Sequence, residues 1–213
     1  MAAHQRSLFA SGTPAVLDAG AAPGSAPGSV TCRSSERVEL GDGAWVDVLR
    51  GWLAGADALL DLLVASVSWR QGRRRMYDRV LDDPRLSAWF ADGTPLPHPV
   101  LHEARLALER RYRAHLPTLG LNYYRDGNDS VAFHADRELR ALDDTLVAVL
   151  TLGARRPFLL RPKAGGRSLD IAPASGDLLV MGGSCQLHHE HGVPKVARAG
   201  PRVSCTWRCA RTT

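Results

Sequence analysis

The chain has 213 residues, of which 45% are hydrophobic and 23% are charged, and it carries a formal net charge of +5 at pH 7. This length is enough for one domain with a full hydrophobic core and too short for two comfortable ones. No apolar run approaches the length that crosses a bilayer, and the first residues, MAAHQRSLFASGTPAVL, lack the continuous apolar segment of a secretory signal. The sequence therefore argues against a membrane protein and predicts an intracellular, cytoplasmic one.

The cysteine and arginine content bears on disulfide bonding and on possible partners. Four cysteines are too few to stabilise a chain of this size by disulfide bonds and do not have zinc-ribbon spacing, so we expect reduced thiols. Almost all of the positive charge is arginine, since Lys163 and Lys195 are the only lysines. A basic balance fits a polyanionic partner, and it fits a solvated surface equally well.

The N-terminal segment differs in composition from the rest of the chain. Residues 19–30 read AGAAPGSAPGSV, a run of small residues that cannot bury enough apolar area to offset its chain entropy. Turn chemistry between two apolar runs begins at VELGDGAWVDVL, from Val38 onward. We therefore predict a disordered tail over residues 1–37 and a single domain over residues 38–213.

Two helices are expected in the first part of that domain. Residues 55–67, GADALLDLLVASV, carry leucines at helical spacing, and residues 99–115 carry apolar residues on one face and charged residues on the other. The stretch between them contains SWRQGRRRMYDRV and DDPRLSAWFADG, which are rich in arginine and aromatics and are broken by glycine and proline. This stretch predicts loops and short edge strands.

The second part of the chain has the pattern of an antiparallel β protein. Short strand-like runs, separated by Gly, Pro and Asp, follow one another from residue 121 to residue 208: LNYYR, SVAFHAD, TLVAVLTL, PFLLRP, DLLVMGG and RVSCTWR. Such spacing is typical of a barrel or sandwich. The predicted fold class is α+β and mainly β, with helices and a substrate lid over residues 38–120 and a jelly-roll core, or double-stranded β-helix, over residues 121–213.

Two clusters of potential metal ligands stand in this β region. His134 and Asp136 are two residues apart, so on a strand they would project from the same face. His188, His189 and His191 cluster in CQLHHEHGVPK, and one of them could complete a site of two histidines and one carboxylate, which binds Fe(II) and leaves positions open for substrate and oxygen. The alternative for the histidine cluster is a polar surface loop.

The last strand-like run, RVSCTWR, is polar on one side only. Arg202, Ser204, Thr206 and Arg208 alternate with Val203, Cys205 and Trp207, and the two arginines would stand about 20 Å apart along an extended strand. If their side chains bend toward each other, they could hold a small dicarboxylate, because the planar guanidinium binds a carboxylate through two hydrogen bonds. The alternative is an edge strand with its polar face in water.

Taken in order, these segments resemble the AlkB family of Fe(II)/2-oxoglutarate dioxygenases. The resemblance covers residues 122–208 and extends more loosely to DPRLSAWF. The segments that carry it are NYYRDGND, HADRE, LTLGARRPFLLR, GDLLVMGG, HGVPK and PRVSCTWR. It is specific because the segments occur in sequence and not singly.

The resemblance implies a role for each matching residue of the iron site. It assigns His134, Asp136 and His191 as the iron ligands. His191 is selected over the two neighbouring histidines because the family ligand stands just before a short segment that ends in Pro-Lys, here residues 192–195.

The resemblance also implies which residues bind the co-substrate 2-oxoglutarate. Arg202 would hold its distal carboxylate, and Arg208 would lie near the carboxylate that chelates iron. Asn122 and Tyr124 fill the Asn-x-Tyr positions that help to hold it. Ser204 stands where the family often has asparagine.

On the substrate side, Glu138 stands where an acidic residue faces the substrate base. Tyr77 lies near the position of an aromatic that wedges into a duplex, although Asp78 replaces the glycine that usually follows. Five arginines are candidates for phosphate contacts, and they could equally form a solvated face: Arg70, Arg73, Arg74, Arg75 and Arg79.

The function implied by the resemblance is oxidative demethylation of bases such as 1-methyladenine and 3-methylcytosine in DNA or RNA. The cofactors would be Fe(II), 2-oxoglutarate and O2, the products formaldehyde, succinate and CO2, and the enzyme a monomer without a membrane partner. Two alternatives remain open. One is a dioxygenase of the same fold that acts on a protein side chain or a small molecule, and the other is a metal-free barrel that only binds nucleic acid.

Overall fold

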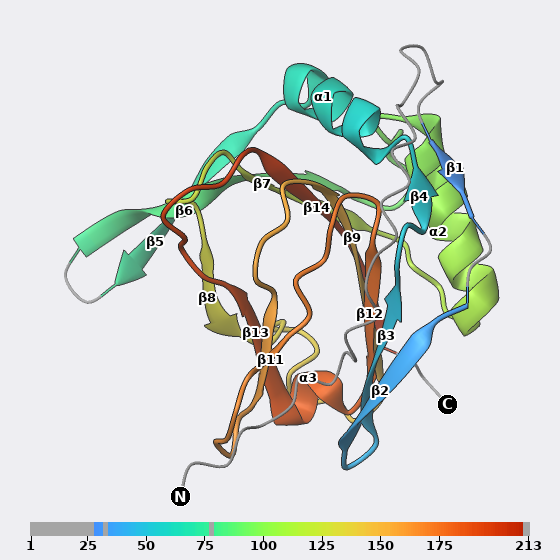
Figure 1. Ribbon diagram of the computed structural model, residues 1–213, viewed down its shortest axis with the longest axis vertical. Helices are drawn as coiled ribbons and strands as arrows, with labels where there is room; N and C mark the ends of the chain where they lie inside the picture. The colour runs from blue at the N-terminus through green and yellow to red at the C-terminus, as the bar shows by residue number, and fades with distance from the viewer. Residues whose placement is uncertain (1–27, 32–33, 77–78, 211–213) are drawn as a thin grey trace, which may run out of the picture.

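The computed structural model describes residues 28–31, 34–76 and 79–210, and it is mainly β (Figure 1). The strands before the second helix are β1 (Ser29–Val30), β2 (Glu36–Gly41), β3 (Ala44–Leu49), β4 (Leu53–Ala54), β5 (Arg70–Met76) and β6 (Arg79–Phe90). Those after it are β7 (Leu119–Tyr124), β8 (Val131–His134), β9 (Thr145–Gly153), β10 (Leu159–Pro162), β11 (Leu169–Asp170), β12 (Leu178–Gly183), β13 (His189–Val193) and β14 (Arg202–Ala210). The helices are α1 (Ala56–Ser66), α2 (Pro99–Tyr112) and α3 (Cys185–His188).

Two antiparallel sheets build the core. The larger sheet has eight strands in the order β2-β3-β12-β9-β14-β7-β6-β5, and the smaller has four in the order β11-β10-β13-β8. A short β1–β4 pair completes the strand pairing of the described residues. The order mixes strands that are distant in the sequence, which confirms the predicted jelly-roll core preceded by helices.

The central strand β9 shows how the sequence separates the two faces of the large sheet. Its run TLVAVLTL is buried along its whole length, as expected of a strand covered on both faces. Leu146, Ala148 and Leu150 belong to the apolar cluster that includes both long helices, whereas Val147 and Val149 belong to a second cluster with residues of the small sheet. The inner face of the large sheet is therefore the one that opposes the small sheet.

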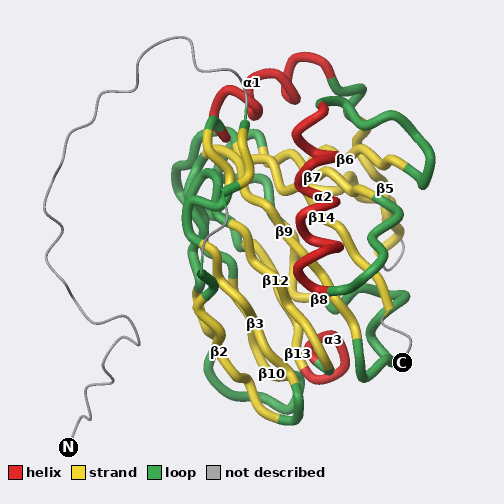
Figure 2. The backbone as a smooth tube through the Cα atoms, turned by 90° about the vertical axis from the view of Figure 1, so that its right-hand side faces the viewer, coloured by secondary structure: helices red, strands yellow, loops and turns green. Residues whose placement is uncertain are grey.

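Both long helices cover the outer face of the large sheet. The predicted apolar face of α2 is buried, including Leu101, Ala104 and Leu108, and Figure 2 shows this helix lying across the strands. On α1 the side chains of Leu59 and Leu63 are fully buried. The sequence prediction for these helices is confirmed, because the apolar periodicity matches the helical repeat.

The segment between the two helices differs from its prediction. We expected loops and short edge strands, but β6 is a strand of 12 residues that pairs with β7 and forms a long hairpin with β5. Pro84 is tolerated because the β5–β6 register shifts between Gln71 and Arg73, so residues 83–85 lie in a bulge where no ladder N–H is required. In Figure 1 this hairpin projects from the body of the molecule.

The N-terminal boundary also differs in part. Strand β1 and the first residues of β2 lie on the N-terminal side of residue 38, where we predicted the tail to end. Residues 1–27 lie outside the described part of the chain, so the division into tail and domain stays a prediction. Among the described helices, none combines the length and apolar character needed to span a membrane.

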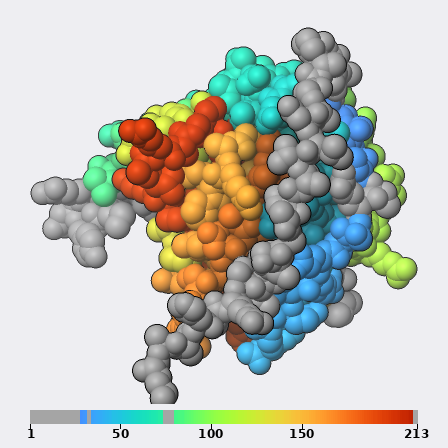
Figure 3. Space-filling view, viewed as in Figure 1, coloured from blue at the N-terminus to red at the C-terminus, as the bar shows by residue number. Residues whose placement is uncertain are grey.

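The loop before β14 forms backbone hydrogen bonds with two other loops. The backbone N–H of Ala154 donates to the carbonyl of Pro201 at 2.9 Å, and that of Val196 donates to the carbonyl of Gly127 at 2.9 Å. Figure 3 shows the surface of this loop in red beside the orange surface that precedes it in the chain. These hydrogen bonds join the loop between β13 and β14 to the β7–β8 connection and to the β9–β10 connection.

Candidate active site

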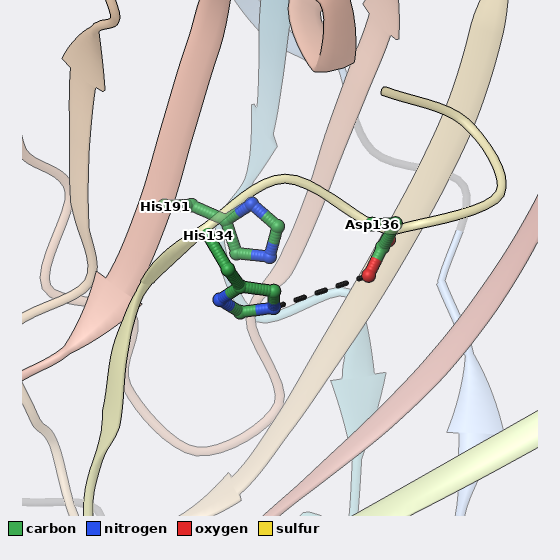
Figure 4. A group of neighbouring side chains, drawn as sticks. All are labelled: His134, Asp136 and His191. Atoms are coloured by element: carbon green, nitrogen blue, oxygen red, sulfur yellow. Dashed lines mark ion pairs between the residues drawn. The ribbon is translucent and has the colours of Figure 1, made fainter. Parts of the chain in front are cut away.

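The His-Asp-His group lies at the small sheet, where it faces the large one. His134 is the last residue of β8 and stands opposite His191 of β13 in the strand register. The candidate ligand atoms of His134, Asp136 and His191 all lie within 4.8 Å of one another, and Figure 4 shows the three side chains converging. The Nε2 atom of His134 is 3.9 Å from Oδ1 of Asp136.

Asp136 reaches this group by a route that differs from the expected one. We expected His134 and Asp136 to share one strand face, but β8 ends at His134 and Asp136 lies in the following turn. The turn is fixed because the Asp136 N–H donates to Oε1 of Gln186 at 2.8 Å, and the Asp136 carbonyl accepts from the N–H groups of Leu139 and Arg140. The side chain is thereby held against the two histidines.

The chemistry of this donor set fits a divalent cation. Burial lowers the pKa of the His191 imidazole well below its ordinary value, with smaller contributions from His134 and Arg208, so His191 is neutral and can donate a lone pair. Asp136 Oδ2 is buried without a hydrogen-bond partner among the described residues. Two imidazoles and one carboxylate form the donor set of a non-haem Fe(II) site with open positions.

The two neighbouring histidines lie elsewhere. His188 is exposed at the end of α3, and His189 is buried at the start of β13, opposite Pro162. Neither belongs to the convergent group of the described residues. The structure therefore brings together the same three residues that the resemblance implies.

A row of polar side chains crosses the inner face of the large sheet next to this group. Thr151 of β9 pairs with Ser204 of β14, Ser204 with Asn122 of β7, and Asn122 with Ser87 of β6. Because paired residues on neighbouring strands share a face, these four side chains form one continuous polar band on the inner face of the sheet.

Arg202 lies at one end of this band and is completely buried. It donates through Nη1 to Ser204 Oγ at 2.6 Å and through Nη2 to Thr151 Oγ1 at 3.2 Å, while Nε has no hydrogen-bond partner in the described part of the chain. Burial lowers the pKa of its guanidinium, and no carboxylate lies within 4.0 Å of it among the described residues. A buried cation without a counter-charge is costly, so this position fits a ligand that brings a carboxylate.

Arg208 lies on the same strand, next to His134, Asp136 and His191, which we call the metal group. Its Nη1 donates to Asp136 Oδ1 at 3.1 Å, and its Cζ lies 5.8 Å from the ring centre of Trp89. Arg202 therefore reaches along the strand to Ser204, whereas Arg208 is engaged by Asp136. Arg202 could hold a carboxylate away from the metal group, and Arg208 could contact one that lies beside it.

Two cavities of different size meet at the metal group. An inner cavity of about 50 Å³ is lined by residues that include His191, Tyr124 and Ser204, and an outer one of about 910 Å³ is lined by residues that include Ser87 and Trp89. Five residues line both cavities: Arg85, Asn122, His134, Asp136 and Arg208. Arg202 itself lies one layer behind the inner cavity, where it contacts the wall residue Ser204.

Among the remaining predicted residues whose side chains the structure describes, Arg70 alone lines one of the two cavities. Glu138 is exposed and lines neither cavity, and Tyr77 lies outside the described residues. Of the five arginines, Arg70 lines the outer cavity, whereas Arg73 is 72% exposed and pairs with Asp82. The side chains of the other three lie outside the described part of the chain.

Sequence reasoning missed several residues of the site. Arg85 and Trp89 lie on β6 with Ser87 between them at alternate positions, a period-2 signal that was hidden because Pro84 and the arginine-rich context suggested a loop. Phe158 stacks on the His191 ring with centroids 5.6 Å apart. Gln186 holds the Asp136 turn from α3 and has no signal in the sequence that could have revealed it.

A comparison with known protein families identifies the class of this site. The family model described as the 2OG-Fe(II) oxygenase superfamily matches residues 58–211. The chain therefore belongs to the 2OG-Fe(II) oxygenase superfamily, the family of dioxygenases that use iron(II), 2-oxoglutarate and O2. The matched segment contains the metal group and both cavities.

Relatives with curated names lie within the AlkB branch. The chain is 32% identical over 177 residues to "Alpha-ketoglutarate-dependent dioxygenase alkB homolog 3" of Mus musculus. This alignment covers 73% of the chain and 62% of the relative. It is 27% identical to "DNA oxidative demethylase ALKBH2" of Arabidopsis thaliana, covering 85% and 71%. The chain thus spans somewhat under two thirds of the length of the mouse relative.

The same fold occurs in enzymes with other substrates. A prolyl hydroxylase from Trichoplax adhaerens, solved in complex with a hypoxia inducible factor oxygen degradation domain peptide fragment, superposes with a TM-score of 0.60 at 12% identity and covers 78% of this chain and 83% of its own. At this level of identity the likeness shows the fold alone.

Proposed function

We propose that the protein oxidatively removes N-methyl groups from alkylated bases of DNA or RNA, consuming 2-oxoglutarate and O2 and releasing formaldehyde, succinate and CO2. The observation that carries this proposal is the position of the metal group at the junction of a small inner cavity and a large outer one. A metal held by these three residues would stand between a co-substrate on the inner side and a group that enters from the outer side. The names of the AlkB relatives support a nucleic-acid base as that group.

His134, Asp136 and His191 would hold the iron. Bound there, iron supplies the activation of O2 that no amino-acid side chain can provide. The protein's share is to fix the three donors: β8 and β13 hold the histidines opposite each other, and the amide of Gln186 fixes the turn that carries Asp136. Contacts of this kind, which lie outside the metal ligands themselves, hold the ligand side chains in position.

The polar band would hold 2-oxoglutarate. Arg202 supplies a buried positive charge that lacks a carboxylate, and Ser204 and Tyr124 line the inner cavity beside it. Asn122 lines the same cavity and accepts a hydrogen bond from Arg85 through Oδ1 at 3.0 Å. This arrangement would orient the co-substrate and exclude water from one side of the metal.

The outer cavity would receive the base after it leaves the stack, as chemistry on a base requires. Trp89 is 57% exposed at this cavity and pairs across the sheet with Gly120. A Cβ atom at Gly120 would lie 3.3 Å from the Trp89 ring, so the glycine leaves room for the indole to lie across β7. An exposed aromatic face is a surface on which bases stack.

The test is a panel of oligonucleotides that each carry one methylated base, incubated with the full chain, Fe(II) and 2-oxoglutarate. We expect formaldehyde release from at least one N-methylated base, together with iron-dependent succinate formation. Succinate formation without demethylation of any oligonucleotide would reject this function. It would leave the alternative of a protein or small-molecule substrate, which a panel of peptides and metabolites would then examine.

A further inference from the structure

The three residues of the metal group receive unequal support from their surroundings. The His191 ring is buried and stacks on Phe158, and the turn that carries Asp136 is fixed by a hydrogen bond to α3. The His134 side chain is 39% exposed, and its Nδ1 lies 3.0 Å from the carbonyl oxygen of Ala132 on its own strand. This contact moves with the strand, so the position of His134 depends on what holds β8.

Strand β8 has few backbone contacts with the rest of the small sheet. It has four residues and lies at the edge of the sheet, and β13 is its only partner among the described strands. The β8–β13 register shifts between His191 and Val193, which interrupts the ladder beside the metal group. The start of β8 is fixed because the Ser130 N–H donates to the Pro84 carbonyl at 2.7 Å. The strand ends at His134, so this ligand stands where the backbone pairing stops.

Arg161 makes a side-chain contact that spans the strands of both histidines. It lies on β10 opposite Glu190 of β13, and its Nη2 donates to Oε2 of Glu190 at 2.9 Å. Its Cζ lies 3.7 Å from the ring centre of Phe133 on β8. Glu190 precedes His191 and Phe133 precedes His134, so one guanidinium contacts the residue before each histidine. Because side chains alternate along a strand, this contact lies on the face of the small sheet opposite to the histidines.

Gly192 allows this contact to cross β13. A Cβ atom at Gly192 would lie 3.1 Å from the Val131 carbonyl oxygen and 3.2 Å from the Phe133 nitrogen, so the backbones of β8 and β13 approach each other closely here. The position also alternates with His191, so it lies on the same face as the Arg161 contact. Since glycine places no side chain there, a residue of β10 can reach a ring on β8.

We propose that Arg161 is a positioning residue of the metal group, which holds the end of β8 against β13 and so keeps His134 opposite His191. This inference rests on the assignment of the three iron ligands in the proposed function, and it does not depend on the identity of the substrate. Arg161 is not among the described lining residues of either cavity, so it would act through the strands and not by contact with a bound molecule. Arginine suits this role because its planar group can pair with a carboxylate at its edge while it stacks on a ring with its face.

The experiment measures the affinity of the metal-free full chain for Mn²⁺, without 2-oxoglutarate or oligonucleotide, from the electron paramagnetic resonance signal of the free ion. Arg161→Gln should weaken Mn²⁺ binding by roughly tenfold, as expected when a contact that orients a ligand is lost. Arg161→Lys, which keeps the charge but lacks the planar group, and Glu190→Gln should each weaken it less. At saturating Fe(II), the KM of Arg161→Gln for 2-oxoglutarate should equal that of wild type, because Arg161 does not line the inner cavity.

The matched control is Arg37→Gln. Arg37 also joins two strands through an ion pair, with Asp47 at 2.7 Å, and through a ring contact, with Trp45 at 3.8 Å, and its side chain is 44% exposed against 43% for Arg161. Because Asp47 is buried, Arg37→Gln should lower the stability of the metal-free chain in denaturant at least as much as Arg161→Gln does. It should nevertheless leave the affinity for Mn²⁺ at the wild-type value.

The inference is overturned if Arg161→Gln and Arg161→Lys bind Mn²⁺ as tightly as wild type, or if Arg37→Gln weakens binding as much as Arg161→Gln. Failure of the ligand assignment looks different, because His134→Ala and His191→Ala would then also bind Mn²⁺ as tightly as wild type. Failure of the proposed substrate would show only in the oligonucleotide panel and would leave all of these affinities unchanged.

Discussion

The inner and outer cavities are built in different ways although they share a wall. The inner cavity is small, and its neighbour Arg202 is fully buried and donates hydrogen bonds to two hydroxyl groups of the polar band of the large sheet. The outer cavity is many times larger and includes Trp89, a side chain that is 57% exposed. In the proposed function, the co-substrate would occupy the smaller space beside the buried Arg202. The substrate would enter the larger space beside the exposed Trp89.

The largest effect on activity is expected from removing a metal ligand, because the metal group borders both cavities. His134→Ala, Asp136→Ala or His191→Ala should each reduce succinate formation to below about one per cent of wild type, because two remaining donors hold iron weakly. His188→Ala and His189→Ala should keep substantial activity, since neither side chain reaches the metal group. Normal turnover by His191→Ala, with an inactive His189→Ala, would show that the third ligand is misassigned.

A second change separates the co-substrate from the metal. Arg202→Lys should raise the KM for 2-oxoglutarate by roughly tenfold or more, because lysine keeps the charge but loses the planar fork that binds a carboxylate through two hydrogen bonds. Iron affinity should stay at the wild-type value, since Arg202 contacts Thr151 and Ser204 and not the metal group. The measurement is a titration of 2-oxoglutarate against succinate release. An unchanged KM would place the carboxylate elsewhere.

On the outer side, Trp89→Ala should weaken binding of a methylated oligonucleotide by about 1–3 kcal/mol, roughly fivefold to 150-fold, because a stacking surface is lost. The slow decay of 2-oxoglutarate without oligonucleotide should change little. Fluorescence anisotropy gives the affinity, and Leu106→Ala, another partly exposed apolar side chain but on α2, is the control. Equal affinities for Trp89→Ala and wild type would remove Trp89 from the substrate surface.

The smallest effect is expected at the connection that leads into β8. Arg125 donates to Asp129 through Nε at 2.8 Å and Nη2 at 2.8 Å, and this hydrogen bonding lowers the pKa of the Asp129 carboxyl. Because the folded-state pKa lies below the unfolded one, the stabilisation is present above the unfolded pKa and is lost as the pH falls through the folded one. Asp129→Asn should therefore cost at most about 1 kcal/mol at neutral pH.

The cost of Asp129→Asn should shrink as the solution becomes acidic, because the wild-type carboxyl then takes up its proton. Denaturant unfolding of wild type and Asp129→Asn at a series of pH values between neutral and acidic measures this difference. A difference that stays constant or grows toward acidic pH would mean that Asp129 stabilises the fold by packing and not by its charge.

The sequence predicted the inner region better than the outer one for a physical reason. His134, Asp136 and His191 are few, chemically distinctive and set at short spacings, and the alternation along the last strand revealed Arg202 and Arg208. One wall of the outer cavity is formed by β6, and the alternating pattern of this strand is hard to recognise in the sequence because Pro84 lies within a bulge. Arg85 and Trp89 gain their position only when β6 pairs with β7, which no local pattern encodes.

Two further details depended on tertiary structure. Asp136 reaches the histidines through a turn held by Gln186, a residue that is 50 positions away in the sequence. Arg156 is buried and donates to the carbonyls of Asp126, Asp129 and Pro194, so it ties the loop before β8 to the segment after β13. Such long-range contacts cannot be read from spacing alone.

The central claim is that the inner cavity serves the co-substrate and the outer cavity serves the substrate. Its most direct test is the ratio of formaldehyde released to succinate formed, with a methylated oligonucleotide that the wild type demethylates. This ratio is measured for wild type, Arg202→Lys and Trp89→Ala. We predict that Arg202→Lys slows both products together and keeps the wild-type ratio, whereas Trp89→Ala lowers the ratio because 2-oxoglutarate is consumed without a positioned base. A fall in the ratio for Arg202→Lys as large as that for Trp89→Ala would contradict this claim.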